Sequence, residues 1–489
     1  MHVLDKLEKA FHPRSIAVVG ASENPFSAGS PFTKHLLTYG YRGKIYPINP
    51  NQKEVYGLMT YPSLKEVSGP VDYIICCISA SHVLSLLDEC PQKGVEVVHM
   101  FTGRFSETGV SEAASLEQEI LQKAKKLGIS LIGPNCMGLY HPKEGISFAY
   151  DLPKETGPVG MLSQSGGLAG EFVRFAQLRE IFFSKVVSYG NGLDINETDL
   201  LNYFAKDSET KVIAAYIEGV KNGTELFPTL RHAARLKPVV ILKAGRSSAG
   251  VKSASSHTGS LAGSTEIWDS VIKQAGAIQV KTFEEMIDML AGLCFLPPVL
   301  GRRVGVVGGG GGVSVLSADG WGEAGFDPAP FPEEIREMIR ENVPPMWWDW
   351  IGNPVDVSMM PESAWTTGLT GNILRMMAES PAYDLVIGNV SIGAPFGKDQ
   401  MIGWVGGYAD EVIEVAKKGS QPLAVVLDTA DLRIEDFEQW RWRLLAEQRS
   451  RFVAAHIPVF SSIAEAASTL SKLAEYYQRR KEITKPSAG

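Results

Sequence analysis

The chain has 489 residues, 44% of them hydrophobic and 49 of them glycine, which is too long for a single core, so we expect about three domains. Charged residues are well mixed and the formal net charge is −8, which argues against nucleic-acid binding through a basic surface. The five cysteines have neither the paired spacing of a zinc ribbon nor the density of a disulfide scaffold. We therefore expect no metal site and a reducing, cytoplasmic environment.

The first fifteen residues, MHVLDKLEKAFHPRS, are charged and amphipathic and lack the apolar core of a signal peptide. No apolar run approaches the roughly 18 residues that a membrane-spanning helix requires. We therefore expect a soluble, unexported protein that does not interact with a membrane.

Short β-branched runs alternate with glycine turns and helical segments, a pattern typical of parallel sheets with crossover helices. Five such runs occupy residues 15–20, 44–50, 72–78, 95–101 and 130–135. They predict a Rossmann-like, doubly wound domain over residues 1–148.

After a linker rich in Pro, Lys and Gly, the same pattern opens twice more. The runs GPVGMLS, VVSYGNGLDI, VIAAYIEG and PVVILKAG predict a second parallel sheet over residues 152–296. The runs RRVGVVGG, DLVIGNVSI and PLAVVLD predict a third over residues 300–480. The two openings are alike in pattern, so we expect two flavodoxin-like α/β domains after the first.

The first glycine turn, VVGASENPFSAG, lies between a predicted strand and a predicted helix, where backbone amides and the helix dipole can hold a pyrophosphate. Its spacing is not GxGxxG. The next strand ends in Asn49 and Pro50 instead of the acidic residue that accepts the ribose hydroxyls of NAD. A dehydrogenase is therefore disfavoured, and the turn is either a nucleotide-like ligand site or a structural tight turn.

One histidine, His257, lies in a long run of Gly, Ser and Ala between residues 242 and 264. Such a run packs weakly and suits a segment that must move. A neutral imidazole can attack phosphorus and hold it as a phosphoramidate of high transfer potential. From these residues alone, His257 is either a phosphoryl carrier or an ordinary polar loop residue.

The segment MLSQSGGLAGEF lies between a strand and a helix, where free amides and the positive helix end make a nest for an anion. The candidate phosphate-binding residues are Ser163, Gln164, Ser165, Gly166 and Gly167. The alternative is an ordinary strand–helix turn. After the next strand, Asp194 and Asp199 are carboxylates that could cap a helix, and we expect that role for Asp199.

The segments GASENPxxxG, YPINP and GPNCMG and the region around CCIS are similar to the CoA-binding domain of succinyl-CoA synthetase and ADP-forming acetyl-CoA synthetase α subunits. SASSHTGSLAG resembles the active loop of the same superfamily. The resemblance implies that His257 carries a phosphoryl group and that Glu218, at the end of a strand, selects the tautomer of its ring. It also implies that the Ser-Gly nest and Asn191 bind phosphate, and that the turn with Gly192 and Asp194 shapes the same site.

The resemblance further assigns contacts with coenzyme A. The CoA phosphates would contact Gly20, Ala21, Ser22 and Pro25, and the adenosine end would contact Pro47, Asn49, Pro50 and Lys53. The pantetheine arm would pass Ile78 and Ser79, and the thiol would lie near Asn135 and Cys136. The 3′-phosphate contact of Lys53 rests on its charge alone, and a solvated lysine is the alternative. We expect Cys136 to be a small apolar residue instead of an acyl-carrying nucleophile.

The segments at residues 308–320 and 353–358 resemble the smaller ligase-type domain of these synthetases. The five consecutive glycines at residues 308–312 are not followed by Lys-Ser or Lys-Thr, so no Walker motif is present. No ATP-grasp region is recognisable in the chain. The resemblance therefore implies a separate ATP-grasp β subunit that binds Mg²⁺ with ADP or ATP, around a homodimer core or in a hetero-tetramer.

The implied reaction interconverts acyl-CoA, ADP and phosphate with a carboxylic acid, CoA and ATP, by way of an acyl phosphate and phospho-His257. The alternative is a CoA-binding regulatory protein without turnover, which would have no need of His257 and Glu218. No motif encodes which acid is used.

Overall fold

The computed structural model describes residues 3–247, 249–250, 264–357, 368–390, 398–427 and 439–484. The chain divides into two compact units, one of Met1–Gln177 with Ile181–Met286 and one of Leu178–Glu180 with Ile287–Gly489. Among the described residues, none of the helices combines the length and apolar character needed to cross a membrane. His257 lies outside the described residues.

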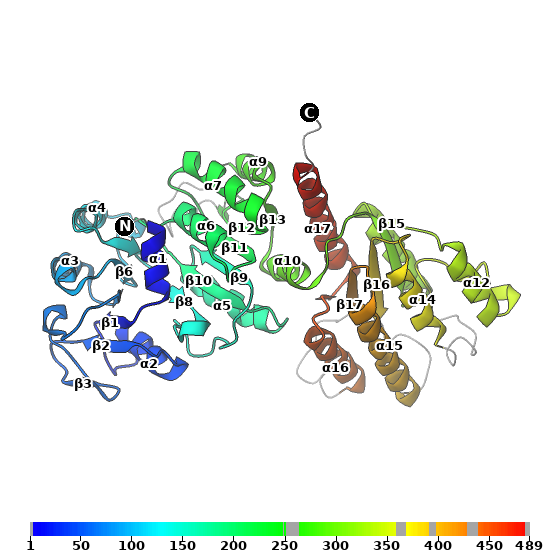
Figure 1. The fold of residues 1–489 in the computed structure, drawn as a ribbon, viewed down its shortest axis with the longest axis horizontal. Coiled ribbons are helices and arrows are strands. Elements are labelled where there is room, and N and C mark those ends of the chain that lie inside the picture. Colours follow the sequence, from blue (N-terminus) through cyan, green and yellow to red (C-terminus); the bar gives the residue numbers. More distant parts are fainter. Residues whose placement is uncertain are drawn as a thin grey trace. The chain divides into compact units, whose positions relative to one another are not determined.

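The first unit contains two large sheets (Figure 1) and a small antiparallel sheet of β3 (Glu54–Val55) and β4 (Leu58–Met59). The first is entirely parallel in the order β2-β1-β5-β6-β7, and β1 therefore lies at the switch point of a doubly wound sheet. Its strands are β1 (Ser15–Val19), β2 (Lys44–Ile48), β5 (Tyr73–Cys76), β6 (Val97–Met100) and β7 (Ser130–Ile132). Its helices are α1 (Val3–Phe11), α2 (Gly29–Tyr39), α3 (Val83–Glu89) and α4 (Ser111–Lys126).

The second sheet has the order β13-β12-β11-β9-β10-β8 and is parallel except for β8, which pairs with β10 in the antiparallel sense. Its strands are β8 (Gly138–Tyr140), β9 (Val159–Ser163), β10 (Phe183–Ser188), β11 (Val212–Ile217), β12 (Val239–Lys243) and β13 (Ile278–Val280). Its helices are α5 (Gly166–Gln177), α6 (Glu197–Lys206), α7 (Gly223–Leu236) and α9 (Thr265–Ala275). Helix α10 (Phe283–Phe295) begins in the first unit and continues into the second. The central strands are buried throughout, as their continuous apolar sequences predict.

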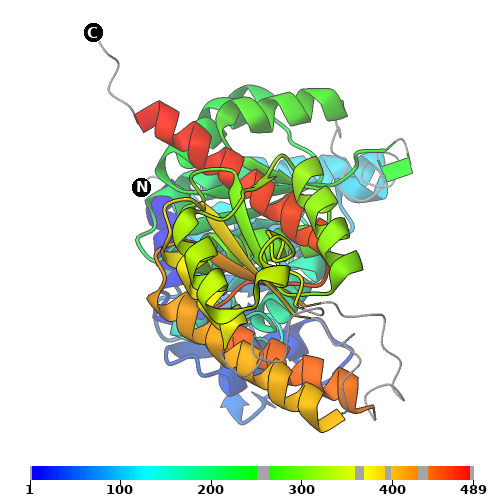
Figure 2. The ribbon, with the colours of Figure 1, turned by 90° about the vertical axis from the view of Figure 1, so that its right-hand side faces the viewer.

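The second unit holds one parallel sheet in the order β15-β14-β16-β17-β18, the flavodoxin-like order. Its strands are β14 (Arg303–Val307), β15 (Asp327–Pro328), β16 (Leu385–Val390), β17 (Leu423–Leu427) and β18 (Val459–Phe460). Its helices include α11 (Gly311–Glu323), α12 (Glu333–Asn342), α14 (Leu369–Glu379), α15 (Lys398–Lys418), α16 (Trp440–Ala454) and α17 (Ile463–Thr484). Helix α11 packs with α17, and α15 packs with α14 and α16, so that the sheet lies between two helical layers (Figure 2).

The first two sheets are joined where β7 of one leads directly into β8 of the other. Residues 133–137 make this connection and carry the GPNCM sequence. The chain therefore passes from the first sheet to the second at the point where the thiol of CoA is predicted to lie.

Candidate active site

Two loops of the first unit, residues 133–136 after β7 and residues 190–195 after β10, are joined by backbone hydrogen bonds. Asn191 N donates to Pro134 O over 3.0 Å, Leu193 N to Gly133 O over 2.9 Å, and Ile195 N to Leu131 O over 3.0 Å. The side chain of Asp194 adds a fourth bond, because its Oδ2 accepts the Leu131 N–H over 2.9 Å. These bonds fix residues 133–136, the predicted thiol loop, and the adjoining end of β7 against residues 190–195, the predicted phosphate loop.

Gly190 is required at this junction. Its φ is +53°, and a Cβ placed on it would lie 2.3 Å from Pro134 O and 2.4 Å from Asn135 O. A side chain would therefore force the two loops apart.

A cavity of about 210 Å³ lies where these loops meet the start of α5. It is lined by Phe101, Asn135, Cys136, Met137, Gln164, Ser165, Gly166, Gly167, Gly190 and Asn191. A Cβ on Gly167 would meet no atom within 4 Å, so the first turn of α5 is open on that side. The cavity brings the predicted thiol residues together with five of the predicted phosphate-binding residues, and Ser163 is the one that does not line it.

The serine side chains near the start of α5 hold the turn itself. Ser163 is fully buried, and its Oγ donates to Ser165 O over 2.7 Å. Ser165 Oγ accepts the Leu168 N–H over 3.4 Å, as a helix cap does. An anion at this turn would therefore be held mainly by the backbone N–H groups that begin α5, which lack partners within the helix.

Gln164 connects the start of α5 to the end of β11. Its Oε1 accepts the N–H groups of Glu218 over 2.7 Å and Gly219 over 3.1 Å. Both partners are donors, so the amide oxygen must face them. Gln164 therefore fixes Glu218 next to the predicted phosphate nest.

Glu218 is buried, with 6% of its surface exposed, and Tyr216 donates its hydroxyl to Glu218 Oε1 over 3.2 Å. The ammonium group of Lys243, at the end of β12, donates to Glu218 O over 2.7 Å and lies over the ring of Trp268. Burial lowers the pKa of Lys243 to about 8, although the Glu218 carboxylate acts in the opposite direction. The strand that leads into the histidine segment thus ends beside Glu218.

Asn191 points its amide nitrogen at two carboxylates. Its Nδ2 donates to Glu107 Oε2 over 2.7 Å and lies 3.4 Å from Glu117 Oε2. Glu117 also accepts the N–H and hydroxyl of Ser106. Asn191 Oδ1 is buried and accepts no hydrogen bond from the described residues. Sequence reasoning missed both acids. Glu107 could have been found because residues 101–109 follow β6 at the carboxyl edge of a parallel sheet, whereas Glu117 is within α4 and had no such signal.

A third residue that sequence reasoning missed is His99, on β6. Its Nε2 lies 2.9 Å from Cys136 O, and because a carbonyl only accepts, this nitrogen carries the proton. Its ring is stacked on Tyr73, and burial lowers the pKa of His99 to about 4, so the ring is neutral. His99 therefore holds the Cys136 carbonyl of the thiol loop in place.

Cys136 has only 3% of its surface exposed, and its Sγ lies 3.7 Å from Met100 O. Burial raises the pKa of its thiol well above the ordinary value. A neutral, buried thiol behaves as a small apolar residue, in keeping with the expectation from the sequence.

The first glycine turn is held by the strand beside it. Gly20 has a φ of +93°, and Gly20 N and Ala21 N both donate to Ile48 O, over 3.0 and 3.2 Å. Asn49 Nδ2 donates to Ala21 O over 2.7 Å. Asn49 therefore braces the glycine turn from the position where NAD enzymes place an acid.

The other predicted CoA contacts lie in the same sheet or directly after its strands. Ser22 Oγ accepts the Asn24 N–H over 3.1 Å, and Ser79 Oγ lies 2.7 Å from His82 Nδ1. Ile78 O accepts the hydroxyl of Thr102 over 2.7 Å. Pro47 is within β2, Pro25 and Pro50 are in the loops after β1 and β2, and Lys53 is exposed. These residues, with Asn135 and Cys136, gather near the carboxyl edge of the first sheet, where α/β proteins bind ligands.

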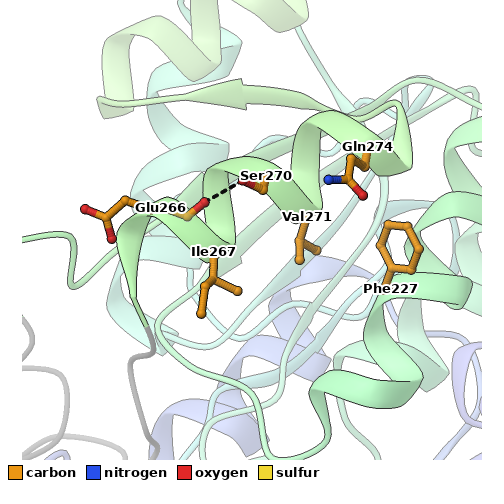
Figure 3. Close-up of a pocket in the computed structure, with 6 residues that line it drawn as sticks. All are labelled: Phe227, Glu266, Ile267, Ser270, Val271 and Gln274. Carbon is orange, nitrogen blue, oxygen red and sulfur yellow. Dashed lines mark hydrogen bonds between the residues drawn. The ribbon is translucent and has the colours of Figure 1, made fainter.

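A second hollow, of about 420 Å³, lies between α7 and α9 (Figure 3). Phe227 of α7 and Ile267 and Val271 of α9 line it, together with Glu266, Ser270 and Gln274. It contains one carboxylate and none of the residues that the sequence singled out. The cavity at the start of α5 is therefore the candidate active site.

Comparison with known proteins identifies the family. A CoA binding domain model matches residues 14–142, and a succinyl-CoA ligase like flavodoxin domain model matches residues 156–293. The α subunit of the ADP-forming acetate–CoA ligase II of Pyrococcus furiosus is 37% identical over 78% of this chain and 81% of its own length. The chain belongs to the ADP-forming acetate–CoA ligase family.

The relationship within this family extends over the whole chain. The ADP-forming acetate–CoA ligase II of Archaeoglobus fulgidus is 30% identical over 98% of this chain and 68% of its own length. A solved structure of the dinucleotide forming acetyl-coenzyme A synthetase 1 of Ca. Korarchaeum cryptofilum, in complex with phosphate and ADP, superposes with a TM-score of 0.82 over 99% of both chains at 30% identity. The family and the fold class predicted from the sequence are confirmed.

Proposed function

We propose that the chain is the CoA-binding, phosphohistidine-carrying subunit of an NDP-forming acyl-CoA synthetase. It would interconvert acyl-CoA, ADP and phosphate with a carboxylic acid, CoA and ATP. The observation that carries the proposal is the cavity that Asn135 and Cys136 share with the start of α5. A thioester and a phosphate bound in that cavity would be held next to each other, which is the main requirement of the first step.

In that step, a phosphate oxygen attacks the thioester carbonyl carbon, the carbon–sulfur bond breaks, and CoA leaves as its thiolate. The product is an acyl phosphate. A ring nitrogen of His257 then attacks its phosphorus, the phosphorus–oxygen bond to the acyl group breaks, and the carboxylate is released. The first turn of α5 supports this assignment, because it lines the cavity and its N–H groups can stabilise the charge on the transferring phosphoryl group.

Glu218 is proposed to accept the N–H of one ring nitrogen of His257, which leaves the lone pair of the other nitrogen for attack. Its burial and its hydrogen bond from Tyr216 support this role, because they restrict the direction of the carboxylate. Gln164 holds the backbone of the same residue by accepting its N–H. Lys243 is proposed to fix the end of the strand that leads to the histidine segment.

The first glycine turn is proposed to hold the CoA phosphates, with Gly20, Ala21, Ser22 and Pro25 nearest to them. The start of α2, which follows the turn at the switch point of the sheet, suits a pyrophosphate through its positive helix end. The N–H groups of Gly20 and Ala21 already donate to Ile48 O, so these two residues would shape the turn around the ligand. Pro47, Asn49, Pro50 and Lys53 would border the adenosine end, and Ile78 and Ser79 the pantetheine arm. The role of Asn49 would be indirect, because its side chain is engaged with Ala21 O.

The nucleotide half of the reaction is proposed to lie on an ATP-grasp β subunit, which would bind Mg²⁺ with ADP or ATP, around a homodimer core or in a hetero-tetramer. Relatives named as α subunits support a separate partner. The chain covers only 49% of the ADP-forming acetate–CoA ligase of Methanocaldococcus jannaschii, which leaves room there for a further half. The three large sheets support the proposed domains at residues 1–148, 152–296 and 300–480. The five free cysteines support a cytoplasmic location.

The test is synthesis of ATP from acetyl-CoA, ADP and phosphate by the chain together with its partner subunit. We expect turnover with the wild-type chain and none with His257→Asn, while both chains are stabilised against heat by CoA and neither by NAD. Stabilisation by CoA without turnover in the wild type would favour the regulatory alternative. Turnover by His257→Asn would contradict the phosphohistidine mechanism.

A further inference from the structure

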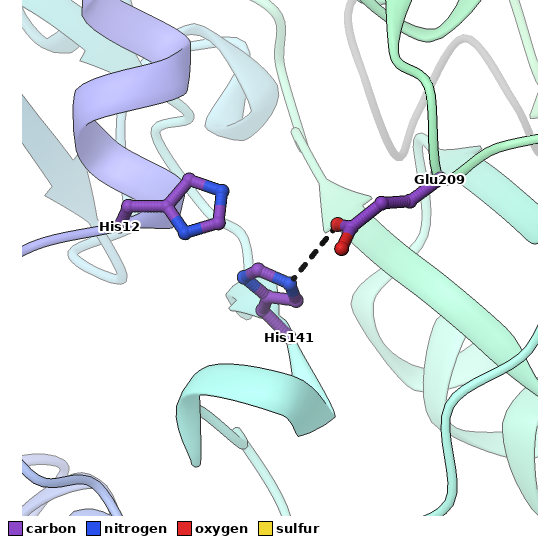
Figure 4. Close-up of side chains that lie close together, drawn as sticks. All are labelled: His12, His141 and Glu209. Carbon is purple, nitrogen blue, oxygen red and sulfur yellow. Dashed lines mark ion pairs between the residues drawn. The ribbon is translucent and has the colours of Figure 1, made fainter.

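Three side chains from distant parts of the first unit meet at a place that the proposed reaction does not use (Figure 4). His12 follows α1, His141 follows β8, and Glu209 lies between α6 and β11. One ligand atom from each lies within 4.8 Å of the others. The spacing of these residues in the sequence gives no metal-binding pattern, and the fold alone brings them together.

The tautomer of His141 leaves a nitrogen lone pair without a partner. His141 Nδ1 lies 2.9 Å from Phe11 O, and because a carbonyl only accepts, Nδ1 carries the proton. Nε2 is therefore unprotonated, and it is buried without a hydrogen bond to any described residue. Glu209 Oε2 is 3.7 Å away, beyond hydrogen-bonding distance. A histidine whose Nδ1–H is held by a carbonyl, with its Nε2 free, is oriented as metal ligands are.

His12 is oriented in the same way by a carboxylate. Its Nδ1 lies 3.0 Å from Glu144 Oε1, so a proton on Nδ1 is held by that carboxylate and Nε2 is then the donor atom. Glu8 Oε1 lies 3.4 Å from that Nε2 and is available as a further oxygen ligand. His12 has 34% of its side chain exposed, so an ion could enter from solvent.

The charges near the three side chains favour a dication. With both imidazole rings neutral, the nearby charges are four carboxylates and two ammonium groups. The carboxylates are those of Glu8, Glu144, Asp207 and Glu209, and the ammonium groups are those of Lys143 and Lys185. Lys185 Nζ lies 2.6 Å from Glu209 Oε2 and 2.9 Å from Asp207 Oδ1. An ion would compete with Lys185 for Glu209 while Asp207 keeps the ammonium group neutralised.

We propose that His12, His141 and Glu209 form a binding site for a divalent transition-metal ion. Two imidazole nitrogens and a carboxylate oxygen are the donor set that Zn²⁺ accepts, with Glu8 or water as the fourth ligand. Tetrahedral ligands of Zn²⁺ are about 3.3 Å apart for bonds of about 2.0–2.1 Å. The 3.7 Å between His141 Nε2 and Glu209 Oε2 needs only a small contraction to reach that distance. The ion would fasten the end of α1 to the second sheet.

The test is titration of the metal-free, full-length chain with Co²⁺, followed by displacement with Zn²⁺. We expect one Co²⁺ per chain with visible d–d bands and without a thiolate charge-transfer band. His12→Gln and Glu209→Gln should each weaken binding at least ~10-fold. Zn²⁺ should raise the melting temperature of the wild type and leave that of His12→Gln unchanged.

The matched controls are His232→Gln, which alters an exposed histidine on α7, and His257→Asn, which tests the histidine outside the described residues. Both should bind Co²⁺ as the wild type does. Because His141 is fully buried and its replacement could unfold the chain, the decision rests on the partly exposed His12. Three results would overturn the proposal: no stoichiometric binding of Co²⁺ by the wild type, undiminished binding by His12→Gln, or loss of binding in either control.

Discussion

The contact between the thiol loop, residues 133–136, and the phosphate loop, residues 190–195, can be tested with two glycines that share a backbone conformation. Gly190 and Gly192 have φ values of +53° and +56°. A Cβ at residue 190 would lie 2.3 Å from a backbone oxygen, whereas a Cβ at residue 192 would lie 3.3 Å from its nearest neighbour, the ring of Tyr189. Gly192→Ala is therefore a matched control for Gly190→Ala.

The left-handed conformation costs an alanine about 1–2 kcal/mol at either position, so this contribution cancels in the difference. At residue 190 the collision adds overpacking, typically ~1–3 kcal/mol. Separation of the loops also breaks the bond from Asn191 N to Pro134 O, which contributes roughly 0.5–1.5 kcal/mol. We expect Gly190→Ala to lower the free energy of unfolding of the first unit by about 2–4 kcal/mol more than Gly192→Ala.

Urea denaturation of both variants measures this difference. The comparison requires that the free energy of unfolding falls with urea concentration at the same slope in both proteins. The functional consequence is measured on the same proteins, since Gly190→Ala should form acyl phosphate more slowly while it still binds CoA at the first glycine turn. Equal stability of the two variants, within about 0.5 kcal/mol, would refute the close contact between the loops.

Three further predictions follow from individual side chains. Gln164→Leu removes the acceptor of two buried N–H groups and should destabilise the first unit by ~2–6 kcal/mol, whereas Gln164→Glu retains the acceptor and should cost less; equal urea midpoints would contradict this. The pKa of His99 is about 4 when folded against 6.5 when unfolded, so the unfolded chain binds the extra proton and roughly 3 kcal/mol of stability is lost as pH falls from 6.5 to 4. His99→Phe should flatten that part of the stability–pH curve, and an unchanged curve would refute the assignment. Lys243→Met should lower kcat without weakening CoA binding, because Lys243 contacts the Glu218 carbonyl and not the glycine turn; a loss confined to CoA affinity would contradict its place in the site.

The fold was predictable because its signals are local. A buried strand, a glycine turn and a helix recur along the chain, and residues such as Gly20 mark where each strand ends. The expectation that Asp199 caps a helix was right about the place but not the position. Asn196 is the N-cap of α6, and Asp199, three residues later, completes a capping box by accepting the Asn196 N–H. The family motifs are local as well, which is why the family could be inferred from them.

The rest of the candidate site depends on contacts between segments far apart in the sequence. Nothing in the GPNC motif indicates that Pro134 accepts a hydrogen bond from residue 191, or that His99 holds the Cys136 carbonyl. Nor does the sequence indicate that the Ser163 hydroxyl, predicted to lie in the phosphate site, donates to Ser165 O within the turn, as serine hydroxyls readily do with nearby backbone groups. Sequence patterns identify which residue types are present, whereas such partners are set by packing.

The most direct measurement is the mapping of phosphorylated residues by mass spectrometry after the chain and its partner subunit are incubated with acetyl-CoA and labelled phosphate without ADP, then quenched at alkaline pH. The proposed mechanism predicts an acid-labile phosphoryl group on His257 in the wild type and much less of it in Glu218→Gln. Label on another residue, or equal labelling of His257 in both proteins, would contradict it.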